Sequence, residues 1–419
     1  MKKLGKITVV CMCMFLVVGA LGPKAWAAEK VLKVGVIGPY TGSNARIGAE
    51  IKNAALMAFE DIGYKIGDYT VKLVFIDDQM DPAKGASAYA EAAEREDVQA
   101  TTICWSSSVT LALMDLAVKY KIPNIGGMGG AQSEIDKYKS DPKYKGYWMG
   151  AYGILSDLAV GYVEFLEDSI QKGLWKPPKK LVALFALDTE WGRTVVSSLK
   201  KSFQNRGWAV SSEDFFSANQ TDFYPAMAKY KNSGATVVAG TSSIAPLTAA
   251  FTKQAAEVGL KAMIINDGLG WIGEWYKLTG PASNYVLDMI PQFSTPKAKE
   301  WAKRYEKKFG FEPSATASGC NYDNINLFVK IAKRAQEKYG KIDKGTLHSV
   351  ISDELCTGKL TYGTDEGAIL VKKFQYSPEL GGAPKTGMDY WGLPVIQYMN
   401  GVGKVVYPPE VKEADPVFK

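Results

Sequence analysis

Apolar residues follow two alternating periods along most of the chain. Short apolar runs, typical of buried strands, are followed by stretches in which apolar residues recur every three or four positions, as on one face of a helix. The first unit pairs a strand at residues 32–37 with a helix from Ile47 to Ile62, and Gly63 predicts the end of that helix. This alternation predicts right-handed βαβ units on a parallel sheet.

The alternation runs through the chain twice. In the first run, further strands are predicted at residues 71–76, 101–104 and 122–125, and helices at residues 82–95 and 109–120. In the second run, strands are predicted at residues 181–187, 209–210, 236–240 and 262–265, and helices at residues 191–205, 222–231 and 245–258. Two similar runs predict two α/β lobes of the same architecture.

Other segments connect or follow these two runs. Extended segments are predicted at residues 148–153 and 285–290, and helices at residues 155–170, 296–309 and 322–336. Thr295 and Pro296 suit the N-cap and first position of a helix, and Gly310 suits its end. The tail after Lys372 is rich in Gly, Pro and Tyr, which predicts strands and loops.

The N-terminus has the pattern of an export signal. Three lysines precede an apolar run at residues 7–21, and an A-x-A sequence follows at residues 25–27. This predicts a secretory signal peptide that is cleaved after Ala27. A membrane anchor is the alternative, but 15 apolar residues are few for a bilayer span. Cys11 and Cys13 lie inside the apolar run, which argues against a lipoprotein.

The net charge changes once this signal is removed. The chain of 419 residues has 50 basic and 44 acidic side chains and a formal charge of +6, with 47% hydrophobic residues, as in globular proteins. Residues 1–27 carry four lysines and no acid, so the mature chain has a charge of +2. No basic block remains that would favour nucleic acid or an anionic membrane. We therefore expect a soluble exported protein.

Histidine and cysteine are too scarce for most kinds of active site. His348 is the single histidine, which excludes a His-based zinc or iron site and leaves one base for a Ser-His-Asp or Cys-His mechanism. An enzyme is therefore the less favoured interpretation, and no metal is expected. Of the three cysteines after the signal, Cys320 and Cys356 are the favoured disulfide pair, because Cys104 ends an apolar strand.

Two glycine-rich segments do not match motifs for cofactors or nucleophiles. The segment at residues 126–130 follows a strand, but Gln132 stands where G-x-G-x-x-G needs its third glycine. The segment at residues 240–244 resembles the G-x-S-x-G elbow of hydrolases but lacks its last glycine. No cofactor is therefore predicted.

Polar and aromatic residues follow several predicted strands. Trp105, Ser106 and Ser107 stand between a strand and a helix, where hydroxyls and free backbone N–H groups suit a carboxylate or phosphate; a simple helix cap is the alternative. Asp267 also follows a strand and could hold an ammonium group or cap a short helix. In open α/β sheets, ligands lie at the carboxyl ends of strands.

Two further positions in the second run complete this set of candidates. Thr241 and Ser242 follow a strand and could add hydrogen bonds, and Trp191 begins a helix. The indole of Trp191 could form an aromatic wall of the site or pack in the core.

These motifs occur together in one order. The segments at residues 37–42 and 188–192, the Ser-rich and Gly-rich turns and the late Asp267 resemble the type I periplasmic solute-binding proteins of ABC transporters, in the branched-chain amino acid (Leu/Ile/Val)-binding family. The resemblance covers residues 31–398, nearly all of the mature chain. Each motif is weak alone, whereas their common order and spacing are specific.

The resemblance implies two Rossmann-like lobes with parallel central sheets, joined by three hinge crossovers. The crossovers are expected near residues 148–152, 286–291 and 370–375. Lobe one would comprise residues 29–149 plus 290–370, and lobe two residues 150–289 plus 371–419.

The resemblance also implies roles for individual residues. A ligand carboxylate would meet Ser106 and the backbone of Trp105 and Ser107, and the ligand ammonium would pair with Asp267. The remaining ligand-binding residues are expected to be Gly129, Gly130, Ala131, Tyr152, Trp191, Thr241 and Ser242. The chain departs from the family pattern at the glycine turn, which lacks a hydroxyl, and at Trp105, which is unusually bulky.

The function implied is that of a periplasmic, monomeric binding component of an ABC importer. It would capture an amino acid of the branched-chain type between the lobes and deliver it to a permease in the inner membrane. The alternatives are the same role for an aromatic or other small carboxylate or amide, a ligand-sensing receptor module and, least favoured, an enzyme.

Overall fold

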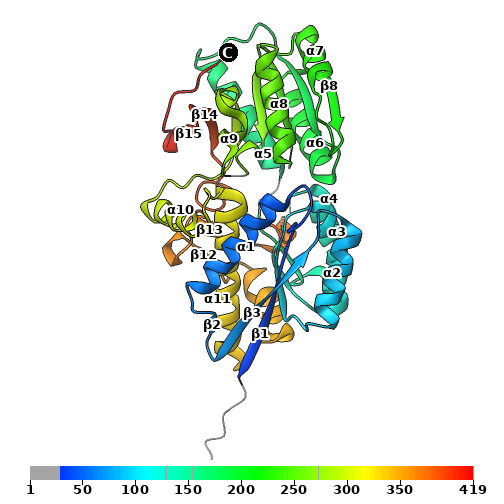
Figure 1. The fold of residues 1–419 in the computed structure, drawn as a ribbon, viewed down its shortest axis with the longest axis vertical. Helices are drawn as coiled ribbons and strands as arrows, with labels where there is room; N and C mark the ends of the chain where they lie inside the picture. The colour runs from blue at the N-terminus through cyan, green and yellow to red at the C-terminus, as the bar shows by residue number, and fades with distance from the viewer. Residues whose placement is uncertain (1–28, 128–129, 153–154, 243, 272, 419) are drawn as a thin grey trace, which may run out of the picture.

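A computed structural model describes residues 29–127, 130–152, 155–242, 244–271 and 273–418. For residues 155–158 it describes the backbone only. The predicted signal peptide lies outside these residues. Two α/β lobes lie one above the other, each around its own sheet, and the described chain starts at the far end of one lobe and ends in the other (Figure 1).

The first lobe is built on a six-stranded sheet. Its order is β2 (Lys65–Ile66), β3 (Tyr69–Asp77), β1 (Lys30–Gly38), β4 (Ala100–Cys104), β5 (Asn124–Gly127) and β6 (Trp148–Gly150). All neighbouring strands are parallel except β2 and β3. Four helices contact the sheet in two pairs on opposite sides: α1 (Ala45–Glu60) with α11 (Asn321–Tyr339), and α2 (Pro82–Glu94) with α3 (Ser107–Tyr120) (Figure 1).

The second lobe is built on a seven-stranded sheet. Its order is β15 (Val402–Tyr407), β14 (Val395–Met399), β11 (Leu287–Met289), β10 (Met263–Asp267), β9 (Val237–Thr241), β7 (Leu181–Leu187) and β8 (Ala209–Phe216). β7 to β11 are parallel to one another, whereas β14 and β15 add an antiparallel edge. The helices of this lobe are α5 (Leu155–Gln171), α6 (Glu190–Asn205), α7 (Tyr224–Ser233), α8 (Ala245–Glu257) and α9 (Trp275–Thr279).

The chain passes between the two sheets three times. It leaves the first lobe after β6 and returns after β11 through α10 (Pro296–Phe309), which contacts α1. The short strands β12 (Tyr362–Gly363) and β13 (Lys373–Phe374) precede the last passage, which ends at β14. The lobe boundaries expected from the sequence stay predictions, because pairing in a sheet does not assign the connecting loops.

Local sequence signals explain where several helices begin and end. Thr295 N-caps α10 by accepting a 3.1 Å hydrogen bond from the Ala298 N–H, and Gly310 ends the helix with φ +80°. Thr189 caps α6 in the same way, with a 3.1 Å bond from the Gly192 N–H. The Thr189 cap places the first turn of α6 directly after the buried strand β7.

The structure shifts one predicted strand and adds two helices that the sequence did not predict. The strand expected at residues 122–125 lies at Asn124–Gly127, because Gly126 and Gly127 continue it. Helices α4 (Gln132–Ser140) and α12 (Lys344–Val350) were not predicted. Both helices are short, and α4 buries only two of its side chains, so they show little apolar periodicity.

The predicted disulfide between Cys320 and Cys356 is wrong. Both thiols and that of Cys104 are free and buried. Cys356 Sγ lies 3.5 Å from the sulfur of Met149, whereas Cys320 ends the π-helical turn Ala315–Cys320 that leads into α11. Each thiol is therefore packed in its own part of the core.

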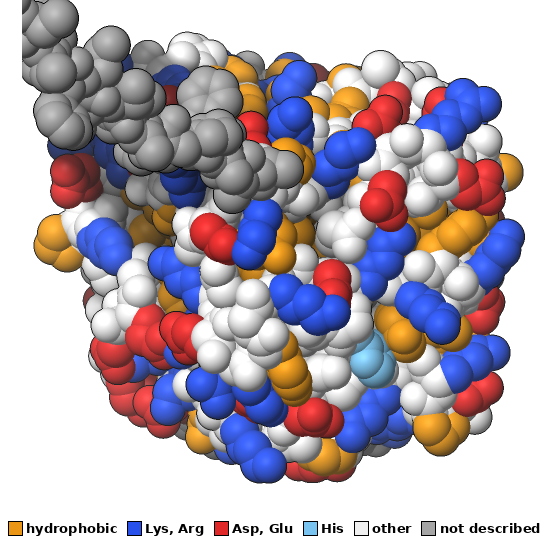
Figure 2. All heavy atoms as spheres, turned by 90° about the horizontal axis from the view of Figure 1, so that it is seen from below, with side chains coloured by type: hydrophobic (Ala, Val, Ile, Leu, Met, Phe, Trp, Pro, Cys, Tyr) orange, Lys and Arg blue, Asp and Glu red, His pale blue; other side chains and the backbone are white. Residues whose placement is uncertain are grey.

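The surface of the first lobe carries mixed charge. On the face seen from below, Lys and Arg side chains lie interspersed with Asp and Glu (Figure 2). Among the described residues there is no helix that is both long and apolar enough to cross a bilayer.

Candidate ligand-binding site

Residues that follow strands of the two sheets meet between the lobes. Trp105 follows β4, and its indole lies edge to face against that of Trp271, which follows β10; the ring centroids are 5.5 Å apart at 87°. Trp191, in the first turn of α6, makes a second such contact with Trp271, at 5.5 Å and 64°. Three indoles from both lobes therefore form one cluster at the carboxyl ends of the strands, where α/β folds bind ligands.

The indole cluster borders a central cavity. Five aromatic side chains and four others line it: Trp105, Tyr152, Trp191, Asp267, Trp271, Met289, Thr316, Trp391 and Leu393. Its free volume is about 20 Å³, enough for about one water molecule. A larger ligand therefore enters only when the lobes separate or lining side chains move.

Asp267 is the acidic residue among the described residues that line the central cavity. Its Oδ1 accepts a 2.9 Å hydrogen bond from the Tyr162 hydroxyl on α5, and Oδ2 accepts a 3.1 Å bond from the Thr241 hydroxyl. Thr241 in turn accepts 3.1 Å from the Trp191 indole N–H. Burial, with the negative charge of Asp288 nearby, raises the pKa of Asp267 to about 8. The carboxyl group is therefore mostly neutral at pH 7.

Asp288 is held in a different way. One of its oxygens accepts from the backbone N–H groups of Gly268 (3.0 Å) and Met289 (2.8 Å). The other accepts from the Gly270 N–H (2.9 Å) and from the Tyr398 hydroxyl (2.6 Å). These four donors fix the loop that carries Trp271, so Asp288 shapes the cavity without lining it.

A second small cavity lies at the N-terminus of α3. It holds about 30 Å³ and is lined by Met80, Trp105, Ser106, Ser107, Ser108, Thr189, Trp191 and Trp271. Ser106 is the N-cap residue of α3, yet its side chain makes no capping hydrogen bond, so its hydroxyl is not used to start the helix. The N-terminus of a 14-residue helix attracts an anion. Three of the indoles line both cavities, which makes them two ends of one site.

Two buried polar atoms of the central cavity lack a partner. Thr316 Oγ1 and Trp391 Nε1 have no hydrogen-bond partner among the described residues, and their side chains are 2% and 1% exposed. Buried polar groups nearly always form hydrogen bonds. This part of the cavity therefore suits a ligand that brings a polar atom of its own.

The site brings together most of the residues predicted from the sequence. Trp105, Ser106, Ser107, Tyr152, Trp191 and Asp267 line one or both cavities, and Thr241 connects Trp191 to Asp267. Gly129 lies outside the described residues. Gly130 lies under the Trp191 ring, since a Cβ at this position would be 2.2 Å from the ring carbon Cζ3.

The other two predicted residues, Ala131 and Ser242, are not among the residues that line the two cavities. Ala131 is buried and precedes α4. The Ser242 hydroxyl accepts a 3.3 Å hydrogen bond from the Ile244 N–H at the start of α8.

Several lining residues were missed in the sequence. Trp271 follows β10, as Trp105 follows β4, so its position after a strand was a usable signal. Trp391 and Leu393 lie in an irregular segment before β14, and Thr316 lies in a π-helical turn. These segments have no periodicity that could have indicated them.

Comparison with known proteins agrees with this architecture. A family model described as periplasmic binding protein matches residues 31–353. The chain belongs to the periplasmic binding protein family. It is of the type I, branched-chain amino acid class, whose fold has two lobes. Members of this family are solute-binding proteins of transporters and are periplasmic.

Individual relatives of this periplasmic binding protein are distant. It is 25% identical over 363 residues to Leu/Ile/Val-binding protein homolog 7 of Brucella suis biovar 1 (strain 1330), covering 83% of this chain and 87% of the relative. A leucine-binding protein of Thermotoga maritima superposes with a TM-score of 0.69 at 19% identity over 89% of this chain and 97% of the other.

A third relative was solved with an aromatic ligand. The solute-binding protein of an ABC transporter from Rhodopseudomonas palustris BisB5, in complex with 3,4-dihydroxybenzoic acid, has a TM-score of 0.69 at 21% identity and covers 89% and 95% of the two chains. At these identities, the two structural likenesses establish the fold alone.

In the described part of the binding protein, acidic, histidine and cysteine side chains form no cluster of three or more that could hold a metal ion. The polar groups at the two cavities are hydroxyls, indole N–H groups, the N–H groups at the start of α3 and the carboxyl group of Asp267.

Proposed function

We propose that this protein is the exported substrate-binding component of an ABC importer and captures a small carboxylate with an apolar, aromatic body. The observation that carries this proposal is the pairing of a serine-rich helix N-terminus with an indole-lined cavity, through the shared side chains of Trp105, Trp191 and Trp271. One end suits an anion and the other a flat apolar group.

The anionic end supports a carboxylate as the charged group of the ligand. The Ser106, Ser107 and Ser108 residues lie at the N-terminus of α3, where N–H groups and hydroxyls can donate to carboxylate oxygens. Separation of the lobes admits the ligand, and closure then surrounds it with groups from both lobes.

The aromatic end supports an aromatic body. Aromatic pairs with offset or edge-to-face geometry gain roughly 0.5–1.5 kcal/mol beyond the area they bury. A ring inserted among Trp105, Trp191 and Trp271 would make several such contacts. The relative bound to 3,4-dihydroxybenzoic acid supports this class of ligand. We therefore place an aromatic carboxylate ahead of the branched-chain amino acid favoured by the sequence.

A branched-chain amino acid is the second candidate. Asp267 could pair with its ammonium group, and the carboxyl group of Asp288 nearby would strengthen that attraction. The names of the Leu/Ile/Val-binding relatives support the same ligand. Against it, the neutral state of Asp267 at pH 7 means that an ammonium ligand must first drive a proton off a buried acid.

The setting of the proposed function follows the family. After removal of residues 1–27, the protein would reside in the periplasm as a monomer and hand its ligand to a permease of the inner membrane. No bond of the ligand is made or broken, so no enzyme activity is proposed.

A thermal-shift panel tests the proposal. Benzoate and its hydroxylated derivatives are compared with leucine, isoleucine, valine and phenylalanine on the protein without residues 1–27. A ligand at about 100 times its Kd stabilises the folded state by about 2.7 kcal/mol, which raises Tm by a few degrees. Shifts with aromatic acids alone support the first candidate, and shifts with aliphatic amino acids alone support the second. A shift with neither class, while a sugar or peptide gives one, would refute the proposal.

A further inference from the structure

The structure has a larger pocket behind the central cavity. This outer pocket has a volume of about 380 Å³, within the range of small-molecule sites, whereas the central cavity holds about 20 Å³. Its wall comes from α5, from β11, from the segment before β14 and from the end of β15: Val160, Gly161, Glu164, Met289, Thr386, Gly387, Met388, Trp391, Leu393, Val395, Tyr407 and Pro408.

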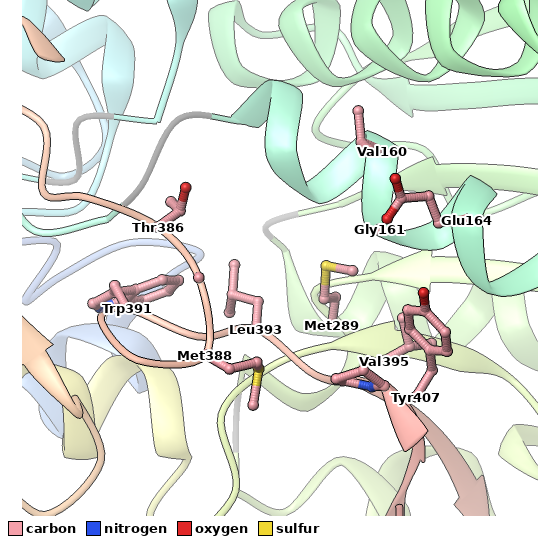
Figure 3. A pocket seen from close by; sticks show the side chains of 12 residues that line it. Val160, Gly161, Glu164, Met289, Thr386, Met388, Trp391, Leu393, Val395 and Tyr407 are labelled. Atoms are coloured by element: carbon pink, nitrogen blue, oxygen red, sulfur yellow. The ribbon is translucent and has the colours of Figure 1, made fainter. Parts of the chain in front are cut away.

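The two spaces share one wall. Met289, Trp391 and Leu393 line both of them. In Figure 3 the Leu393 side chain stands between those of Trp391 and Met289, with Gly161 on α5 beyond Met289. The barrier between the central cavity and the outer pocket is therefore a single layer of side chains.

Met289 is the movable member of this wall. Its terminal methyl carbon lies 2.3 Å from the place where a Cβ of residue 161 would be, so the bare Cα of Gly161 leaves the room that the thioether occupies. Methionine has three rotatable bonds and fills irregular gaps. Trp391 is held more firmly, because its ring lies edge to face on Tyr152 at 4.6 Å and is 1% exposed. Of these two residues, Met289 is therefore the one whose side chain can rotate to connect the two spaces.

The charge around the outer pocket favours one orientation of a bound carboxylate ligand. Glu164 is the acidic group in its lining, with 45% of its side chain exposed, and it lies 4.0 Å from Arg206. A carboxylate would be repelled there, whereas the α3 N-terminus at the other end attracts one. Trp391, whose buried Nε1 has no hydrogen-bond partner among the described residues, lines both spaces.

We propose that the outer pocket extends the ligand site and takes the apolar tail of an aryl-alkyl carboxylate whose carboxylate lies at the α3 N-terminus, with Met289 setting how long that tail can be. This rests on the proposed function, since it assumes a carboxylate ligand in the central cavity.

A homologous series of ligands tests this proposal. Benzoate, phenylacetate, 3-phenylpropanoate and 4-phenylbutanoate are titrated calorimetrically into the protein without residues 1–27. Each buried CH₂ is worth about 0.8 kcal/mol, which is about fourfold in Kd. We expect affinity to rise by about that factor per step. A constant or falling affinity beyond benzoate would overturn the extension while leaving the proposed function standing.

Two variants probe the pocket itself. Val160 is 40% exposed and lines the outer pocket but not the central cavity. Val160→Trp should fill the outer pocket and weaken the two longest ligands at least tenfold with benzoate unchanged. Val402→Trp, at a 50% exposed position on β15 outside that lining, is the matched control. Met289→Ala opens the wall and should favour the long ligands over benzoate relative to wild type.

The other possible results of these experiments also support or contradict the proposal. Equal weakening of all four ligands by Val160→Trp would overturn the proposal, because it would place them all in the same space. If none of the four binds while leucine does, the aromatic carboxylate assigned as the ligand is wrong and the extension fails with it. If benzoate alone binds, the extension alone fails.

Discussion

The backbone N–H of Gly273, in the second lobe, donates a 3.3 Å hydrogen bond to Oε1 of Glu50, in the first lobe. The other oxygen of this fully buried carboxylate is held by the first lobe, through the N–H (2.7 Å) and hydroxyl (2.6 Å) of Ser314 and the hydroxyl of Ser318 (2.7 Å). The acceptor for Gly273 is therefore in place before the lobes meet. Contact between the lobes completes a polar cluster that each lobe alone leaves open.

Gly273 also brings the backbones of the two lobes close together. A Cβ at residue 273 would lie 2.2 Å from the carbonyl oxygen of Glu312, in the first lobe. Beside it, Arg46 reaches across to Glu274 at 3.0 Å, with 28% and 23% of the two side chains exposed. A side chain at position 273 would therefore hold the lobes apart.

We expect Gly273→Ala to weaken ligand binding. Overpacking of this kind costs about 1–3 kcal/mol, or about 5- to 150-fold in Kd, because the obstacle is backbone and cannot rotate away. The ligand-free Tm should stay the same, since separation of the lobes relieves the clash. Kd from calorimetry and Tm from scanning calorimetry check both parts.

Gly345→Ala is the control for that substitution. Gly345 lies in α12, where an added Cβ would meet only the Asp343 carboxylate, at 3.5 Å. Its Kd should equal that of the wild type. A Gly273→Ala protein with a normal Kd, or one whose Tm drops in proportion to its loss of affinity, would show that the contact does not act on closure.

Ser106→Ala should weaken the binding of a carboxylate ligand. A hydrogen bond to a charged group is worth about 1.5–3 kcal/mol, so Kd should rise about 10- to 150-fold. Because the Ser106 side chain does not cap α3, the ligand-free Tm should change little. Ser349→Ala, which removes an exposed hydroxyl bonded at 3.0 Å to the Gly345 carbonyl, is the matched control. Equal Kd values for both variants would show that the ligand carboxylate does not bind at the α3 N-terminus.

The predictable part of the site lies at strand ends. Apolar runs locate the ends of β4 and β10, which made Trp105, Ser106 and Asp267 candidates for ligand binding at strand ends. The two strands belong to different sheets, so it was the family resemblance, and not the spacing, that implied one shared site between the lobes. The same logic made Ser242 a candidate, and Ser242 is not among the residues that line the two cavities. Its position after β9 is right, but the orientation of its hydroxyl toward the Ile244 N–H is a local turn that spacing does not reveal.

The unpredictable part depends on tertiary contacts. The period of α5 indicates that Tyr162 faces inward, yet only the packing of α5 on the second sheet shows that its hydroxyl meets Asp267. Trp391 comes from a segment without periodicity and reaches the cavity because the chain returns from β13 to β14 between the lobes. The cysteine pairing failed for a related reason, since parity and burial do not say which thiols lie within bonding distance.

The free thiols give a direct chemical test. Burial raises the pKa of Cys104, Cys320 and Cys356, so all three should be unreactive in the folded protein. Ellman's reagent should count three thiols after unfolding in guanidinium and close to none before it, on protein without residues 1–27. A reductant should leave Tm unchanged. A count of one thiol after unfolding, with a Tm that falls on reduction, would show that two of the cysteines form a disulfide.

The ionisation of Asp267 distinguishes the two candidate ligands by the pH dependence of binding. In the ligand-free protein, burial and the charge of Asp288 raise its pKa to about 8. An aromatic carboxylate dries the cavity and adds a negative charge, so binding raises this pKa further. Affinity should then be constant below about pH 7 and fall by up to tenfold per pH unit above pH 8.

A branched-chain amino acid reverses this slope. Its ammonium group favours the ionised form, so binding lowers the pKa of Asp267 and releases a proton; affinity should rise with pH until about pH 8. Calorimetry from pH 6 to 9 in two buffers of different ionisation enthalpy measures both the slope and the proton count. Asp267→Asn, which stays neutral at every pH, should flatten either profile, keep most of the affinity for an aromatic acid and abolish most of that for an amino acid. A wild-type Kd that is independent of pH would mean that Asp267 does not face the ligand, because either class must otherwise shift its ionisation.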